Sequence, residues 1–122
     1  MVVVAMLIAG AVGAWARYEL SGWIQARAGT PLPWGTALVN LAGTAPLAAL
    51  VAAHHAGLVT AGWLAVLGTG FAGAFTTFST WMVESVHLAG EGGRPGLRDA
   101  VINLAGQLLA GSLMAVVLLA FA

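Results

Sequence analysis

One apolar stretch of the chain, residues 70–85, carries a dense run of hydroxyl groups in the sequence GFAGAFTTFSTWMVES. Four hydroxyls fall within five consecutive positions, beside two aromatic rings. On an α-helix, Thr77, Thr80 and Glu84 lie at i, i+3 and i+7 and share one face. A single Ser or Thr in a membrane helix often bonds back to a carbonyl one turn earlier. The density of hydroxyls here favours instead a polar track that carries an ion or a small solute.

Further polar side chains occur within apolar segments, where lipid cannot satisfy them. Asn40 lies deep in one segment, and its amide offers two donors to an anion or to another helix. Asn103 and Gln107 lie one turn apart in a second segment and are candidates for the same polar interior. Arg17 lies near the end of a third, where it either snorkels to the headgroups or attracts anions at a vestibule.

Gly70, Gly73 and Thr76 precede the hydroxyl-rich run. Glycines at such positions allow a membrane helix to open and to free backbone carbonyls toward a cavity. Carbonyl oxygens are hard ligands that suit sodium or a similar cation. A cation site is therefore one interpretation of these residues, and close helix packing is the other.

The composition places these residues in a membrane protein. The chain has 122 residues, of which 61% are hydrophobic and 7% charged, and its mean hydropathy is +0.97. Soluble domains are about half apolar and a quarter charged. A net charge of zero argues against a nucleic-acid partner, and the chain has no cysteine for a disulfide or a thiolate metal site. No nucleotide-binding loop, catalytic triad or zinc motif is present, so no enzyme is predicted.

Four segments are long enough to span a bilayer, which takes about 20 residues. The predicted spans are residues 2–23, 34–53, 60–86 and 100–121, and they form one transmembrane domain, 1–122. Short connections rich in Gly and Pro predict an up-down four-helix bundle with both termini on one side. Glycines such as Gly10 and Gly13 allow close helix approach. Because so thin a bundle encloses polar groups poorly, a second subunit is expected.

Three segments together resemble the Fluc/CrcB family of fluoride channels: GAVGAWARY (10–18), GTALVNLAG (35–43) and GFAGAFTTFST (70–80). The resemblance covers all four spans in order. It implies an antiparallel, dual-topology dimer of four-helix subunits in which the third helix is broken. The implied function is passive, selective export of fluoride across the cell inner membrane, driven by the membrane potential.

The resemblance also implies roles for matching positions. The carbonyls of Gly73 and Thr76 from both subunits would hold a buried structural sodium ion. Trp81 takes a place where the family usually has Phe, and Gln107 takes the place of a hydroxyl; both are large enough to crowd the pathway. The expected fluoride pathway comprises Arg17, Asn40, Thr77, Phe78, Ser79, Thr80, Trp81, Glu84 and Gln107.

The arginines favour one orientation in the membrane. Arg27, Arg94 and Arg98 lie in the first and third connections, whereas the second has no Lys or Arg. The positive-inside rule then predicts that both termini lie outside. A dual-topology homodimer needs almost no bias, so a heteromeric channel with a partner of opposite orientation is an alternative hypothesis.

Two other classes of protein compete with a channel. A small proton-coupled multidrug exporter is also a four-span dimer, but it needs a membrane-embedded carboxylate in the first span. Glu19 is the acidic residue there, and it lies close to the end of the span. A non-transporting scaffold subunit accounts for the glycines but not for the hydroxyl-rich run.

Overall fold

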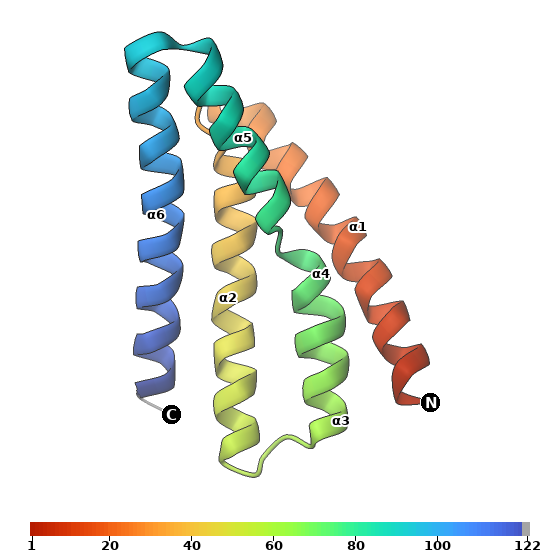
Figure 1. Ribbon diagram of the computed structural model, residues 1–122. Helices are drawn as coiled ribbons and strands as arrows, with labels where there is room; N and C mark the ends of the chain where they lie inside the picture. Colours follow the sequence, from red (N-terminus) through yellow and green to blue (C-terminus); the bar gives the residue numbers. More distant parts are fainter. Residues whose placement is uncertain (121–122) are drawn as a thin grey trace.

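A computed structural model describes residues 1–120 as an all-helical bundle (Figure 1). Within these residues, four helical stretches are long and apolar enough to cross a membrane. The prediction of a four-span, all-α membrane protein is therefore confirmed. Phe121, the last residue of the fourth predicted span, lies outside the described residues. The elements are α1 (Val2–Ala28), α2 (Trp34–His55), α3 (Ala61–Trp63), the π-helical segment η1 (Leu64–Ala72), α4 (Gly73–Phe75), α5 (Phe78–Glu91) and α6 (Gly93–Ala120).

The helices run alternately up and down, and the first and last described residues lie at the same end of the bundle (Figure 1). The third pass consists of α3, η1, α4 and α5 in succession. In its lower half η1 packs against α1 and α2, whereas in its upper half α5 packs against α6. α2 also packs along α6 and contacts α1, so it lies at the centre of the bundle.

Glycines set the close contact between α1 and η1. A Cβ at Gly13 would collide with the carbonyl oxygen of Phe71, and one at Gly70 would come within 2.8 Å of the carbonyl oxygen of Met6. The two backbones therefore approach each other without side chains between them. Such contacts are typical of membrane helices, where van der Waals packing replaces the hydrophobic drive.

Two helices extend well beyond the predicted spans. α1 continues to Ala28 and ends where Gly29 adopts a left-handed conformation with φ of 62°. α6 begins at Gly93, so that only Gly92 separates it from α5. The Gly- and Pro-rich sequence between them indicates a longer connection. Pro95, however, falls in the first turn of α6, where a proline costs no backbone hydrogen bond.

The third pass is not one continuous helix. α4 ends at Phe75, and α5 starts at Phe78. The two residues between them have extended backbones, with φ and ψ of −89° and 158° at Thr76 and of −147° and 121° at Thr77. The expectation that Thr77 shares a helix face with Thr80 and Glu84 is wrong, because Thr77 precedes the helix and caps its N-terminus.

Candidate functional site

Asn40 of α2 holds the two-residue interruption between α4 and α5. The backbone N–H of Thr77 donates to Oδ1 of Asn40 at 2.8 Å, and Nδ2 of Asn40 donates to the carbonyl of Thr77 at 3.1 Å. One carboxamide thus pairs with both polar groups of one backbone residue. In a membrane, non-helical backbone is tolerated only where protein or water satisfies it, so Asn40 accounts for the interruption.

The same interruption leaves two backbone carbonyls without the N–H donors that a continuous helix would give them. In a continuous helix the carbonyl of Gly73 would accept from the N–H of Thr77, which here donates to Asn40. The carbonyl of Thr76 would accept from the N–H of Thr80, which here donates to Oγ1 of Thr77 at 3.3 Å. Gly73 is exposed and Thr76 is half-buried. Both carbonyls named in the sodium expectation are therefore free of their usual helical bonds.

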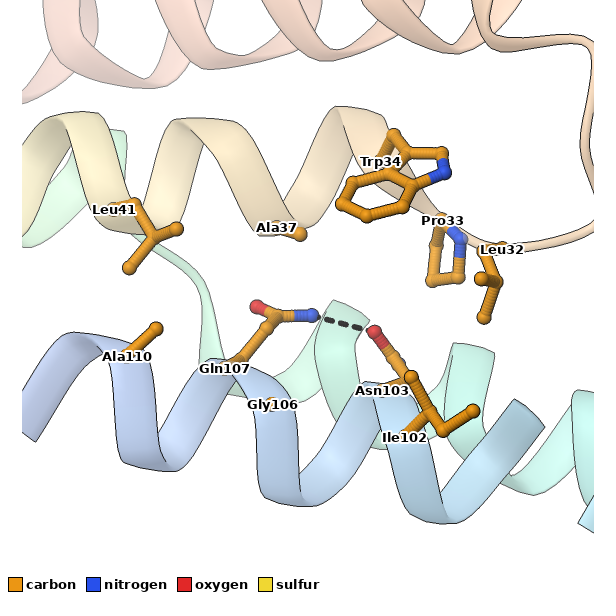
Figure 2. A pocket seen from close by; sticks show the side chains of 10 residues that line it. All are labelled: Leu32, Pro33, Trp34, Ala37, Leu41, Ile102, Asn103, Gly106, Gln107 and Ala110. Carbon is orange, nitrogen blue, oxygen red and sulfur yellow. Dashed lines mark hydrogen bonds between the residues drawn. The ribbon is translucent and has the colours of Figure 1, made fainter. Parts of the chain in front are cut away.

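A chain of side-chain hydrogen bonds runs from Asn40 through α6 to α5. Nδ2 of Asn40 donates to Oε1 of Gln107 at 2.9 Å. Nε2 of Gln107 donates to Oδ1 of Asn103 at 2.7 Å (Figure 2). Nδ2 of Asn103 donates to the hydroxyl of Ser85 at 2.8 Å, and that hydroxyl donates to the carbonyl of Trp81 at 2.8 Å. Asn103, Gln107 and Ser85 are buried, so each depends on its partner in the chain.

The two aromatic residues of α5 form a pair beside this network. The rings of Phe78 and Trp81 meet edge to face, with their centroids 5.6 Å apart and their planes at 85°. Nε1 of Trp81 donates to the carbonyl of Asn103 at 2.9 Å, which fixes the indole against α6. Phe78 has no such tether, and 69% of its surface is exposed. The Trp81 side chain is thus held in place at the site by a hydrogen bond, whereas the Phe78 side chain is exposed on the surface of the chain.

The hydroxyls at the start of α5 are linked to one another. Oγ1 of Thr77 accepts from the N–H of Thr80 as an N-cap and donates to Oγ1 of Thr80 at 3.0 Å. The hydroxyl of Ser79 lies 3.5 Å from that of Thr77. Thr77 is buried, whereas Ser79 and Thr80 are exposed on the outer surface of this chain. Their polar groups would face hydrocarbon unless protein or water covered them.

Glu84 of α5 bonds to α2 and not to the amides of the network. The hydroxyl of Thr36 donates to Oε1 of Glu84 at 2.7 Å. Oε2 of Glu84 is buried and has no hydrogen-bond partner among the described residues. Thr36 was not a predicted site residue, although it lies one helical turn before Asn40 on α2, and that spacing could have indicated it.

A cavity of about 290 Å³ opens beside the interruption. The residues that line this cavity include Thr76 at the interruption and Gly111 and Ser112 on α6. Ser79, Thr80 and Glu84 are not among its lining residues, and neither is Arg17, which is half-buried on α1. The expected pathway residues that the cavity does bring together are Asn40, Thr77, Phe78, Trp81 and Gln107.

A second cavity, of about 200 Å³, lies between α2 and α6 (Figure 2). Its walls are mainly apolar, with Trp34, Leu41 and Ile102 among them, and its polar lining residues are Asn103 and Gln107. Gln107 lines both cavities. Its side chain therefore stands between them.

The first cavity suits a small anion by its chemistry. Amide and hydroxyl groups supply hydrogen-bond donors, and aromatic ring edges carry partial positive charge. Among the described residues no group of three or more His, Cys, Asp or Glu side chains lies close enough to hold a metal ion. A hard cation at this site would depend on backbone carbonyls instead.

Comparison with known proteins places the chain among close relatives. The family model described as CrcB-like protein, Camphor Resistance (CrcB) matches residues 4–119. The chain is 50% identical over 84 residues to the Fluoride-specific ion channel FluC 1 of Symbiobacterium thermophilum, an alignment that covers 63% of this chain and 64% of that protein. It is 37% identical over 113 residues to the Fluoride-specific ion channel FluC 2 of Bacillus cereus strain ATCC 14579, covering 91% of this chain and 90% of that protein.

Proposed function

This chain belongs to the CrcB family, and on that premise we propose that it is a passive, fluoride-selective channel that exports fluoride across the cytoplasmic membrane. The family match confirms the resemblance inferred from the sequence, and the four apolar spans make the chain a multi-pass membrane protein. The relatives are named as ion channels and not as enzymes. The observation that carries the proposal is the cavity beside the interruption in the third pass. It combines amide, hydroxyl and aromatic groups within an apolar bundle.

Those groups match the requirements of fluoride. The ion is small and strongly hydrated, so a pathway must replace its water with hydrogen-bond donors. The side-chain amides of Asn40 and Gln107 carry such donors along the cavity, and the edges of Phe78 and Trp81 flank an anion without trapping it. A series of weak contacts lets the ion leave as readily as it enters. A membrane potential that is negative inside drives the anion outward.

The active form would be a dimer of antiparallel subunits. Ser79 and Thr80 are exposed on α5 at a depth where lipid cannot satisfy their hydroxyls. Phe78 also projects from the same helix. A second subunit packed on this face would cover those groups. It would also complete the polar track, because Ser79, Thr80 and Glu84 do not line the cavity of the single chain. Arg17 would lie at the mouth of the pathway.

The break in the third helix would serve a structural sodium ion at the dimer interface. Gly73 and Thr76 fit this role because their carbonyls lose their helical partners at the interruption. Carbonyls from two subunits would surround the ion with oxygen ligands. A cation there would offset the repulsion between carbonyl dipoles that face one another, and would join the subunits.

The multidrug-exporter alternative is not favoured. Glu19, the carboxylate that such a carrier would need in the first span, is exposed and lines neither cavity. Its place on α1 also separates it from the amide network on α2, α5 and α6. The polar side chains that line the 290 Å³ cavity carry amides and hydroxyls and no carboxylate.

Fluoride efflux from liposomes tests the proposal. Vesicles that contain the purified chain are loaded with potassium fluoride, and valinomycin is added to carry the balancing potassium. We expect rapid release of fluoride and retention of chloride in vesicles loaded with potassium chloride. Release of both anions at similar rates, or of neither by a correctly folded dimer, would contradict a self-sufficient fluoride channel.

A further inference from the structure

We infer that Gln107 is a selectivity-determining residue, because its side-chain oxygen occupies the position on Asn40 that a fluoride ion must take. The inference rests on the proposed function and deepens it, since it identifies the group that an entering ion displaces. Its basis is the hydrogen-bond arrangement of Asn40 and the place of Gln107 between two cavities.

Both amide protons of Asn40 are already engaged. One is donated to the carbonyl of Thr77 and the other to Oε1 of Gln107. A carboxamide nitrogen has two protons and no more. The carbonyl of Thr77 belongs to the backbone at the interruption, so it cannot withdraw without rearranging the third pass. Gln107 is a side chain with several rotatable bonds, so its oxygen is the acceptor that an anion can replace.

Gln107 is also placed to move. Asn40 lines the 290 Å³ cavity and not the other, whereas Asn103 lines the 200 Å³ cavity and not the first. Gln107 lines both. Figure 2 shows its side chain reaching from α6 toward α2, next to Asn103. Rotation into the apolar cavity would release the proton of Asn40 and keep Gln107 close to its partner Asn103.

This exchange discriminates between anions. Every ion that binds Asn40 must first break the bond between Asn40 and Gln107. Hydrogen bonds to a charged acceptor are roughly twice as strong as those between neutral groups. Fluoride concentrates its charge and accepts strong bonds, which offset the lost one. Chloride is larger and a weaker acceptor, so it gains less from the same donor. Gln107 thus weakens the binding of all anions and excludes weak acceptors.

Selective labelling allows a direct test. The chain contains only two asparagines, Asn40 and Asn103, and two glutamines, Gln25 and Gln107. Protein labelled with nitrogen-15 in Asn and Gln therefore gives four side-chain amide groups, which single substitutions assign. Fluoride is titrated into the dimer in detergent while these signals are followed. In the wild-type protein we expect the Asn40 and Gln107 signals to shift together, at the same fluoride concentrations.

The variant Gln107→Met keeps the length of the side chain and removes the acceptor. We expect the Asn40 signal to respond at about fivefold lower fluoride than in the wild type, as loss of one net hydrogen bond predicts. We also expect chloride to shift that signal in the variant alone, and the ratio of fluoride to chloride efflux to fall. Leu109→Met is the matched control, since Leu109 is exposed and lines neither cavity. Gln107→Leu gives a second variant if the first misfolds.

Three results would overturn the inference. The first is a shift of the Asn40 signal without a shift of the Gln107 signal, and the second is an Asn40 signal that does not respond to fluoride. The third is a Gln107 variant in which the Asn40 signal responds only at the same or a higher fluoride concentration than in the wild type. Failure of the proposed function is a separate result, because it is measured as absent fluoride efflux from wild-type liposomes. The amide titration reports on binding whether or not the ion crosses the membrane.

Discussion

At the scale of single residues, the site depends on Asn40. Its carboxamide makes three hydrogen bonds, two of them to the backbone of Thr77 and one to Gln107. The bonds to Thr77 take the place of helical bonds at the interruption. The bond to Gln107 connects α2 to the buried amides of α6. One side chain therefore joins the backbone geometry of the third pass to the polar interior.

Replacement of Asn40 by Asp tests this double role. Asp keeps an oxygen that can accept from the N–H of Thr77. Its second oxygen, however, replaces the amide nitrogen that donates to the carbonyl of Thr77 and to Oε1 of Gln107. We expect the free energy of unfolding to fall by about 1–3 kcal/mol or more, because buried acceptors lose their partner. Thermal unfolding in detergent would measure it. Ser112→Ala is the control, since Ser112 is exposed. Equal stability of Asn40→Asp and the control would contradict the role.

Residue types and spacing were enough to select Asn40, Asn103 and Gln107 as polar residues within apolar spans. They did not show that Asn40 bonds to the amides of α6, because Asn40 and Gln107 lie 67 positions apart in the chain. Thr36 and Ser85 were missed for the same reason. Each is an ordinary helix hydroxyl until the fold brings it to Glu84 or Asn103.

At the scale of elements, hydropathy predicts the four spans, but it does not predict the interruption at Thr77. A periodic pattern continues across the two extended residues, so it suggests one uninterrupted face. Thr77 is a favourable N-cap residue, and this local signal is consistent with a helix that starts at Phe78. The stronger cause is Asn40, a tertiary partner that takes the N–H of Thr77 from the helix.

The contact between α1 and η1 gives a prediction at this scale. In Gly13→Ala the new Cβ would collide with the backbone oxygen of Phe71, and a backbone atom cannot turn aside. We expect the helices to separate and the unfolding temperature in detergent to fall. Gly22→Ala on the same helix meets nothing within 4 Å. It should be neutral or stabilise by up to about 1 kcal/mol through helix propensity. A Gly13→Ala protein as stable as Gly22→Ala would show that α1 and η1 do not touch so closely.

At the scale of the whole molecule, positive charge gathers at one end. Arg27 closes α1, and Arg94 and Arg98 lie in the first turns of α6, so all three lie at the end opposite the termini (Figure 1). The guanidinium of Arg27 lies 4.0 Å from the centre of the Trp23 ring. An arginine beside an aromatic residue is typical of the boundary between membrane and water. The three arginines that predict the orientation therefore lie together at one end of the structure.

This charge asymmetry bears on whether two copies of this chain can form the proposed antiparallel dimer. The positive-inside rule predicts that the arginine-bearing end lies in the cytoplasm. The chain has no cysteine, so single cysteines report its orientation. In intact cells, insertion in one orientation would let a membrane-impermeant maleimide label Ala56→Cys, between α2 and α3, and spare Thr30→Cys, between α1 and α2. Both positions are exposed. The proposed dimer of two identical chains requires both orientations, so we expect both positions to be labelled. Exchange of the three arginines for Gln is the control, because it removes the signal that favours one orientation.

Labelling of one position alone would mean that all copies insert the same way. An antiparallel pair would then need a different chain of opposite orientation, and the channel would be heteromeric. Equal labelling of Ala56→Cys and Thr30→Cys in the unaltered background would exclude that requirement. Two copies of this chain would then suffice, and three arginines at one end would be too weak a signal to fix the insertion of so small a protein.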